Sequence, residues 1–564
     1  MTWPSVLPPR PALWAVFATI AILWFVNLDS HRLWHPDEGR YAEIPREMAV
    51  SGDWVTPRLD DFKYFEKPPL QYWVTAAAYR AFGVDEWTAR LWPALAGLLA
   101  VIAIGGAGLA LGGPALGAFA ALALAGTLWH AAIAQMVTLD SGLSFFLALA
   151  FSAFVIAQRP EATAAGARAW MWVAWAAIAG ATLSKGPVAL VLPAGALVGY
   201  TLITRDVAVW RRLHLASGVA LYLALTVPWF VEVARRNDEF LQFFFIHEHL
   251  ARFLTKEANR IGPWYYFIPI AIVGSLPWLG LLAYGAKRTW RDGQPNALGF
   301  SWQRFALVWA AVVFLFFSAS GSKLPSYILP MFAPLALVAG SLAVALEPRT
   351  LANIAWPGAI VAAASTLVVL AAYDRLVAPL TGNTQPMDIL LAYGPWLEAA
   401  LLAVTAGSIA SVIAFRRARD HAPARFWGVA ALSVSMLAAV QLATAGFDAF
   451  SATRSTSAIL RAAQASGPIP PSAPFYQIEM YDQTAPFYLE RPTTLVNYRD
   501  ELALGIEAEP GKAIPSVAAW LPQWRSLAQG YAMMSPELYA RLAAEGVPMR
   551  VLARDSRRIV VSRH

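Results

Sequence analysis

The sequence predicts a mainly α-helical protein that crosses a membrane many times and carries a small α/β domain at its C-terminal end. Three observations support this fold class. The composition is 58% hydrophobic and only 14% charged, apolar runs recur along most of the chain, and these runs stop near residue 446. A helix of about 20 residues spans the ~30 Å hydrocarbon core of a bilayer. Because lipid offers no partner to an open backbone, such runs must be helices.

The apolar runs predict about thirteen transmembrane helices. The first follows Arg10 and lacks a convincing small-residue cleavage site, so we interpret it as a retained anchor and not as a cleaved signal peptide. The predicted spans are 12–28, 89–110, 114–133, 141–157, 169–183, 186–203, 214–231, 264–285, 305–319, 327–346, 356–373, 396–415 and 426–446.

The distribution of Lys and Arg predicts a cytoplasmic N-terminus. With that orientation, the cytoplasmic segments hold fifteen basic residues and five acidic residues. This asymmetry explains much of the net charge of +7 without a nucleic-acid partner. The basic residues are Arg10, Arg159, Arg168, Arg205, Arg211, Arg212, Lys287, Arg288, Arg291, Arg304, Arg349, Arg416, Arg417, Arg419 and Arg425, and the acidic ones are Glu161, Asp206, Asp292, Glu347 and Asp420.

Two domains are predicted. Residues 1–446 form the transmembrane domain, which includes outer loops at 29–88 and 232–263. Residues 447–564 form the outer α/β domain, because the long apolar runs give way to short strand-like and helix-like stretches. The strand-like stretches are Thr493–Tyr498 and Arg558–Ser562, and the helix-like stretches lie near 516–529 and 535–545.

The first outer loop is the richest in chemistry. Asp37, Arg40 and Tyr41 are spaced i, i+3 and i+4, so a helix would place them on one face, and Pro45 would make that helix short or kinked. One interpretation is a functional site. The alternative is an N-cap at Asp37 and an Arg40 that touches lipid phosphates.

Three more polar insertions lie at the outer ends of predicted spans, and they carry Asp140, Lys185 and Lys323. Ionisable groups at such depth are costly and usually face a partner or an aqueous cavity. A single lysine that extends to the interface is the alternative for each insertion. Three insertions on one side favour a shared cavity.

That cavity would join the carboxylates of Asp37 and Asp140 to an excess of cations. Such a site suits a phosphate with a lipid tail, and tyrosine hydroxyls could donate hydrogen bonds to the same anion. The candidate phosphate-binding residues are Arg40, Lys67, Lys185, Lys323, Tyr64 and Tyr327.

The second outer loop contains His247, Glu248, His249 and Arg252. Two histidines at i and i+2 do not share a helix face, so this is no HExxH-type metal motif, and a surface helix is the favoured interpretation. A divalent metal held by His247 and Glu66 remains an alternative. The chain has no Cys, which excludes disulfides, thiolate catalysis and Cys-based zinc sites.

Together these motifs resemble a known family. The pair Asp37-Glu38 in a long first outer loop resembles the acidic signature of the GT-C glycosyltransferases. Three stretches are similar to the bacterial aminoarabinose transferases that modify lipid A. They are His35-Pro36-Asp37-Glu38-Gly39-Arg40-Tyr41, Phe65-Glu66-Lys67-Pro68-Pro69-Leu70 and Ser322-Lys323-Leu324-Pro325-Ser326-Tyr327.

The resemblance implies a multi-pass protein of the bacterial inner membrane whose active site and C-terminal domain are periplasmic. The donor would be undecaprenyl phosphate carrying 4-amino-4-deoxy-L-arabinose, and the acceptor a phosphate of lipid A. Arg40 and Lys67, with Arg252 nearby, would hold the donor phosphate. Asp37 would position the acceptor, stabilise the cationic anomeric centre or act as a base, with Asp140 as the second catalytic carboxylate. No cofactor is required, and a monomer is expected.

Two alternatives remain from the sequence. A related GT-C transferase could place a polyprenyl-phosphate sugar on a protein or another glycan. A transporter of lipid-linked sugars would also have many helices and a charged cavity, but it would normally carry charges near the bilayer midplane and a repeated architecture. Here the charges gather at one face and no internal repeat is evident.

Overall fold

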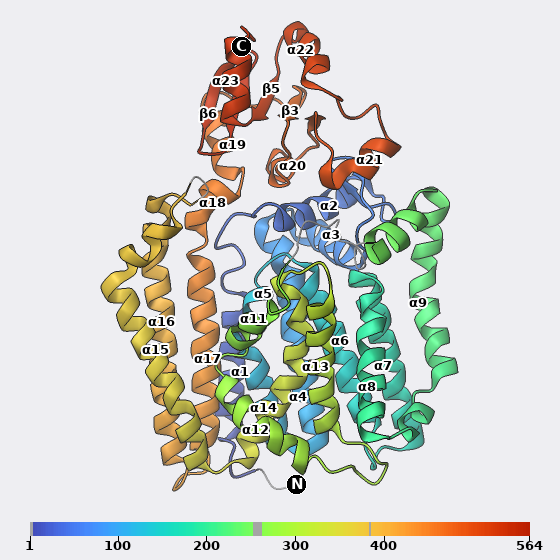
Figure 1. The fold of residues 1–564 in the computed structure, drawn as a ribbon, viewed down its shortest axis with the longest axis vertical. Coiled ribbons are helices and arrows are strands. Elements are labelled where there is room, and N and C mark those ends of the chain that lie inside the picture. The colour runs from blue at the N-terminus through green and yellow to red at the C-terminus, as the bar shows by residue number, and fades with distance from the viewer. Residues whose placement is uncertain (1–3, 252–261, 383–384) are drawn as a thin grey trace.

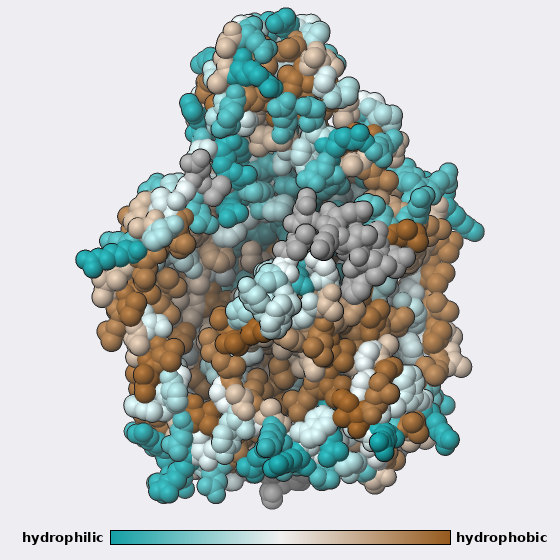
Figure 2. Space-filling view, viewed as in Figure 1, coloured by the Kyte–Doolittle hydropathy of each residue, from teal (hydrophilic) through white to brown (hydrophobic). Residues whose placement is uncertain are grey.

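The computed structural model describes residues 4–251, 262–382 and 385–564. Figure 1 shows a bundle of long helices, with short helices of the outer loops above it and the C-terminal domain above those. The N-terminal end of the chain lies at the opposite end of the molecule from the C-terminal domain (Figure 1). On the face that Figure 2 shows, an apolar band covers the bundle between two hydrophilic ends, as expected for a chain that crosses a membrane.

The bundle contains a helical segment at each predicted span. Within the described residues, eight helices are long and apolar enough to cross a membrane, or nine if the bent pair α11–α12 is one span, and α1 and α8 are shorter apolar helices. The exact number of thirteen spans therefore stays a prediction. The segments are α1 (Arg10–Phe25), α4 (Glu86–Ala125), α5 (Leu128–Ile133), α6 (Leu139–Ala157), α7 (Ala164–Lys185), α8 (Val188–Thr204), α9 (Leu215–Arg236), α11 (Phe267–Gly274), α12 (Leu279–Asp292), α13 (Trp302–Ala319), α14 (Phe332–Ala345), α15 (Pro348–Val377), α16 (Met387–Arg417) and α17 (Ala424–Ala445), with short helices η1 (Ala208–Arg212), η3 (Pro325–Met331) and η4 (Ala378–Leu380) between them.

Helix α4 is in fact a helical hairpin, because the chain reverses at Gly112 and Gly113. Gly113 has φ +79°, which glycine adopts without strain. A Cβ on Gly108 would lie 2.8 Å from the backbone oxygen of Leu116, and one on Gly117 would lie 2.9 Å from the oxygen of Gly105. Small residues thus allow the two arms to pack closely, as in other membrane helix pairs. The arms correspond to the separate predicted spans 89–110 and 114–133.

The first outer loop folds into α2 (Asp37–Ser51), a short antiparallel hairpin of β1 (Arg58–Leu59) and β2 (Phe62–Lys63), and α3 (Leu70–Phe82). Pro45 was expected to make the first helix short or kinked; it does not end the helix, since α2 continues through Pro45 to Ser51. Nearly all of α2 is buried, because the C-terminal domain covers it. The second outer loop begins with the π-helix η2 (Gln242–Ala251).

The C-terminal part is built around a mixed five-stranded sheet of order β4-β3-β5-β7-β6. Strands β4, β3 and β5 are parallel, and β5, β7 and β6 are antiparallel. Trp520 and Trp524, one helical turn apart, pack against Tyr476 of the sheet. The elements are α18 (Asp448–Arg454), α19 (Ser457–Gln464), β3 (Phe475–Ile478), α20 (Thr484–Leu489), β4 (Thr494–Val496), η5 (Asp500–Leu502), α21 (Ala503–Ala508), α22 (Val517–Ser526), β5 (Tyr531–Met534), α23 (Pro536–Ala544), β6 (Arg550–Arg554) and β7 (Ile559–Ser562).

Both strand-like stretches and both helix-like stretches predicted for this region correspond to elements of the structure: β4, β7, α22 and α23. Strands β3, β5 and β6 were not predicted. β3 and β5 are buried on both faces, so their sequences lack the alternation that marks a half-exposed strand. The division of the chain at residue 446 itself stays a prediction.

The C-terminal domain packs closely on the first outer loop. A Cβ on Gly39 would lie 2.7 Å from the backbone carbon of Gln483, and one on Gly505 would lie 2.7 Å from the backbone oxygen of Lys63. The Asp60 carboxylate accepts hydrogen bonds from the backbone N–H (2.5 Å) and the hydroxyl (2.7 Å) of Thr493. The segment that carries the candidate site is therefore held between the bundle and this domain.

Candidate active site

A small cavity lies where α2, the segment after β2, the ends of α6 and α7, and η3 meet. Its volume is about 30 Å³. Among the described residues, three carboxylates and three cations line it, so the predicted excess of positive charge is wrong. The lining residues are Asp37, Arg40, Tyr41, Glu66, Lys67, Thr138, Leu139, Asp140, Lys185, Leu324 and Tyr327.

Asp37 faces this cavity from the first turn of α2. The N-cap position is Pro36, so Asp37 is the first helical residue, which contradicts the alternative in which Asp37 is the N-cap. Its side chain is 40% exposed and accepts a hydrogen bond from Arg40 Nη1 at 3.0 Å. A carboxylate in a first helical turn is stabilised by the helix dipole. Asp37 is thus a fixed charge that remains accessible from the cavity.

Arg40 lies beneath the C-terminal domain and not against lipid. Its side chain is only 7% exposed, which contradicts the alternative in which it touches lipid phosphates. Nη2 pairs with Glu501 at 2.5 Å, and Nε has no hydrogen-bond partner among the residues with described positions. Burial raises the pKa of Glu501, although Arg40 beside it acts in the opposite direction. The Arg40 guanidinium therefore pairs both with Asp37 of its own helix and with Glu501 of the C-terminal domain.

Lys67 joins the two outer loops. Its ammonium pairs with Glu248 of η2 and donates to the backbone oxygen of Glu66 at 2.9 Å. Glu248 is buried, so this ion pair is shielded from solvent. Glu248, for which the sequence predicted no role, thus pairs with a cation that we predicted to bind phosphate.

Asp140, Lys185 and Tyr327 form one cluster at the ends of α6, α7 and η3. Lys185 Nζ pairs with Asp140 Oδ1 and lies 4.6 Å from the centre of the Tyr327 ring. The other carboxylate oxygen, Oδ2, accepts a hydrogen bond from Ser326 Oγ at 2.9 Å. The structure thus brings together three candidate residues from segments far apart in the sequence.

Two predicted phosphate ligands do not line the cavity. Lys323 donates to the backbone oxygens of Ser318 (2.9 Å) and Ser320 (2.5 Å), so its ammonium is engaged elsewhere. Tyr64 is buried, which raises the pKa of its hydroxyl well above the ordinary value, and that hydroxyl has no partner within the described part of the chain. Arg252 lies outside the described residues.

The structure gives little support to a metal at Glu66 and His247. Glu66 lines the cavity, but His247 is exposed and stacks on Phe243 with a ring distance of 5.2 Å. In the described ranges, the one group of three or more possible ligands close enough for a metal comprises Asp29, Asp85 and Glu86. It does not include either predicted ligand.

Glu38 follows Asp37 but serves the fold. It pairs with the fully buried Arg90 at 3.0 Å, and Arg90 also donates to the backbone oxygens of Leu28 and His31. Burial alone would raise the pKa of Glu38, but the guanidinium of Arg90 holds this pKa well below its ordinary value. An arginine near the start of a predicted span was the available signal for this pair.

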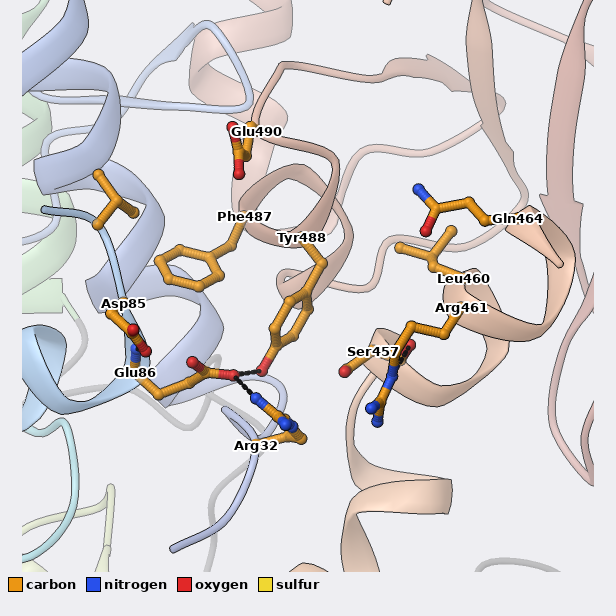
Figure 3. Close-up of a pocket in the computed structure, with 11 residues that line it drawn as sticks. Arg32, Asp85, Glu86, Ser457, Leu460, Arg461, Gln464, Phe487, Tyr488 and Glu490 are labelled. Atoms are coloured by element: carbon orange, nitrogen blue, oxygen red, sulfur yellow. Dashed lines mark hydrogen bonds and ion pairs between the residues drawn. The ribbon is translucent and has the colours of Figure 1, made fainter. Parts of the chain in front are cut away.

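A second cavity, of about 290 Å³, lies between the start of α4 and helices α19 and α20 of the C-terminal domain. Figure 3 shows Arg32 and Tyr488 meeting Glu86 there. The Arg32–Glu86 ion pair measures 2.7 Å, and the Tyr488 hydroxyl donates to Glu86 at 3.2 Å. None of the predicted site residues lines this cavity, which marks a contact between the bundle and the C-terminal domain.

Comparisons with known proteins match this chain to glycosyltransferases. The aminoarabinose transferase C-terminal domain model matches residues 461–563, and the dolichyl-phosphate-mannose-protein mannosyltransferase model matches residues 12–244. The undecaprenyl phosphate-α-4-amino-4-deoxy-L-arabinose arabinosyl transferase of Erwinia tasmaniensis is 31% identical over 402 residues, 69% of this chain and 71% of the relative. Transferase 2 of the same name from Pseudomonas fluorescens is 29% identical over 446 residues, 78% of this chain and 72% of the relative.

A solved structure matches almost the whole chain. It is ArnT from Cupriavidus metallidurans bound to undecaprenyl phosphate, with a TM-score of 0.91, 38% identity and coverage of 99% of each chain. Its apo form gives a TM-score of 0.90 at 38% identity and 98% coverage of each chain. The chain is therefore a multi-pass membrane glycosyltransferase with the GT-C fold, and it belongs to the undecaprenyl phosphate-α-4-amino-4-deoxy-L-arabinose arabinosyl transferase family.

Proposed function

We propose that this chain transfers 4-amino-4-deoxy-L-arabinose from undecaprenyl phosphate to a phosphate group of lipid A at the periplasmic face of the inner membrane. The observation that supports this most is the cavity itself, which joins Asp37 to the cations Arg40, Lys67 and Lys185 at one end of the helix bundle. The likeness to a structure that holds undecaprenyl phosphate, over 99% of the chain, supports the same donor.

The reaction is a displacement at the anomeric carbon. A phosphate oxygen of the acceptor forms the new bond to C1, and the bond from C1 to the donor phosphate breaks and releases undecaprenyl phosphate. Negative charge grows on the leaving oxygen, and fixed cations stabilise it most in the transition state. Lys67 and Arg40 serve that purpose in our proposal.

Asp37 acts on the sugar side of the reaction. Positive charge develops at C1 as the bond to the leaving group lengthens, and a carboxylate nearby stabilises it. A phosphate acceptor is already ionised at neutral pH, so it needs no strong base, and proton abstraction is the lesser role for Asp37. The exposure of its side chain to the cavity supports this assignment.

The orientation in the membrane is part of the proposal. The N-terminus is cytoplasmic, and the C-terminal domain is periplasmic together with the cavity. The basic residues of the alternate loops and the separation of the two ends in Figure 1 support this arrangement. We also propose that the chain acts as a monomer and needs no nucleic acid or cofactor. A chelator is therefore expected to leave its activity unchanged.

The transfer would reduce the negative charge of lipid A, since the new sugar carries an amine. Cationic peptides such as polymyxin would then bind more weakly. The test is mass spectrometry of lipid A from a strain that lacks its own transferase and expresses this chain. We expect the mass of one aminopentose on lipid A, and increased polymyxin resistance.

Asp37→Asn separates a catalytic charge from a structural contact. Asn keeps the size and can still accept the hydrogen bond from Arg40, so the protein should be present in the membrane but inactive. Asp292→Asn is the matched control, because Asp292 is exposed and pairs only with Arg288 one turn away among the described residues. Unmodified lipid A with well-expressed wild-type protein would contradict the proposed function. A sugar found on protein or another glycan instead would favour the related GT-C activity.

A further inference from the structure

The environment of the Lys185 ammonium resembles a binding site for an ammonium ligand. Asp140 supplies a carboxylate oxygen on one side, and the Tyr327 ring faces the ammonium at 4.6 Å. A carboxylate and an aromatic face are the two groups that bind ammonium ions most favourably in proteins. Ser326 fixes the second oxygen of Asp140 at 2.9 Å, so the carboxylate keeps its orientation whether or not Lys185 is present.

The charges of the cavity support a ligand that carries both signs. Its lining holds three carboxylates and three cations, and the buried carboxylates of Glu248 and Glu501 pair with two of those cations. With those two counted, five carboxylates face three cations, so a donor with only a phosphate would add to an existing excess of negative charge. A donor with a phosphate and an ammonium group would leave the balance unchanged.

The size of the cavity requires that an internal contact opens. A volume of about 30 Å³ holds about two water molecules, which is less than a sugar needs, so a sugar can enter only where side chains separate. Among the three partners in the cluster, Lys185 has the flexible four-carbon side chain, whereas Asp140 is held by Ser326. Lys185 is therefore the side chain that can move.

We propose that the 4-ammonium group of the donor sugar takes the place of Lys185 Nζ between Asp140 and the ring of Tyr327, and that Lys185 turns to the donor phosphate. Asp140 and Tyr327 then select an amino sugar. This assigns Asp140 to substrate recognition and not to catalysis, and it assigns the Tyr327 ring, not its hydroxyl, to the contact. The inference rests on the proposed function, since it takes the aminoarabinose donor as the substrate.

The experiment compares two donors in the purified full-length protein. One is undecaprenyl phosphate with 4-amino-4-deoxy-L-arabinose, and the other carries L-arabinose, in which a hydroxyl group replaces the amine. The measured quantity is the ratio of kcat/KM for the amino donor to that for the hydroxyl donor. We expect a ratio of about 10 to 100 in the wild type, the usual effect of a charge-assisted hydrogen bond.

Three variants change this ratio in different directions. Asp140→Asn should bring it toward one, because the amide lacks the charge. Tyr327→Leu should reduce it about threefold to tenfold, while Tyr327→Phe should keep most of it, because only the ring face contacts the ammonium. Lys185→Met should raise the ratio, since Asp140 then has no internal competitor. Asp292→Asn, far from the cavity, should leave it unchanged.

The outcomes separate this inference from the proposed function. A wild-type protein that transfers neither donor would contradict both the proposed function and this inference. A wild-type ratio near one, with the amino donor transferred well, removes only the present inference. A wild-type ratio that persists in both Asp140→Asn and Tyr327→Leu also overturns it. Should Asp140→Asn fail to reach the membrane, the comparison of Tyr327→Leu with Tyr327→Phe decides, because equal ratios in the two would refute the ammonium site.

Discussion

Gly39→Ala tests whether the contact between α2 and the C-terminal domain positions the active site. Gly39 lies between Asp37 and Arg40 on α2. A Cβ there would lie 2.7 Å from the backbone carbon of Gln483 and 2.8 Å from the backbone nitrogen of Thr484. Real Cβ atoms essentially never come so close to backbone, and backbone atoms cannot turn aside as a side chain can. The extra methyl group must therefore move α2 and α20 apart.

The size of the effect follows from two opposing contributions. Overpacking costs about 1–3 kcal/mol, whereas Ala in place of Gly stabilises a helix by about 0.5–1 kcal/mol. The net destabilisation is then at most about 2.5 kcal/mol. Activity should suffer more, because a 1 Å misplacement of catalytic groups can cost about 10²-fold. We expect transfer to lipid A to fall at least tenfold while the helix bundle stays folded.

Gly358→Ala is the matched control. Gly358 also lies within a helix, α15, but a Cβ there would meet nothing within 4 Å, so only the gain in helix stability applies. The assay combines thermal unfolding in detergent, limited proteolysis of the C-terminal domain and transfer measured on lipid A. Wild-type transfer and an unchanged Tm in Gly39→Ala would refute the role assigned to this contact.

Three further variants address the site and its support. Lys67→Ala should lower transfer by about 10²-fold, the usual loss when one transition-state donor is removed. Lys67→Arg should not restore transfer fully, because a planar guanidinium replaces a compact ammonium. Normal transfer by Lys67→Ala would exclude this residue from the site. Arg90→Met leaves the buried carboxylate of Glu38 without its main partner and should cost about 3–5 kcal/mol in thermal unfolding, part of which Glu38→Gln should recover in the double variant. Burial raises the pKa of Asp60 to about 8, so the folded protein keeps a proton that the unfolded chain releases near pH 4. The stability from this group is complete below about pH 4, is lost as the pH rises to about 8, and changes by at most 1.36 kcal/mol per pH unit. Asp60→Asn should flatten the dependence of Tm on pH in that window, and an unchanged slope would show that Asp60 does not titrate there.

The sequence predicts the helical bundle well because the required information is local. An apolar run long enough to cross a bilayer is helical wherever it lies, and polar insertions at the ends of such runs must gather at one end of the bundle. For that reason Asp140, Lys185 and Tyr327 could be expected in one cavity, although 187 positions separate the first from the last (327 − 140). The structure places all three in its lining.

The partners of the cations could not be predicted in the same way. Glu501 reaches Arg40 from 461 positions away (501 − 40), and its position depends on how the C-terminal sheet packs on α2. The prediction that Lys323 binds phosphate was wrong for the opposite reason. Its sequence position was correct, but a lysine near the end of a helix can satisfy its ammonium with nearby backbone oxygens, and only the side-chain conformation decides between these and the cavity.

The carboxylates that accompany each cation explain how a site for an anionic donor can exist without a ligand. Arg40, Lys67 and Lys185 each have a carboxylate partner, so three positive groups that are largely buried can share a small space with little mutual repulsion. A donor then binds by exchange of ion pairs, which changes the number of uncompensated charges little when the donor brings both signs. A donor that brings only a phosphate leaves a carboxylate such as Asp140 unpaired, and an unpaired buried charge is strongly unfavourable. Selectivity for an amino sugar would therefore arise from the same ion pairs that keep the empty site stable.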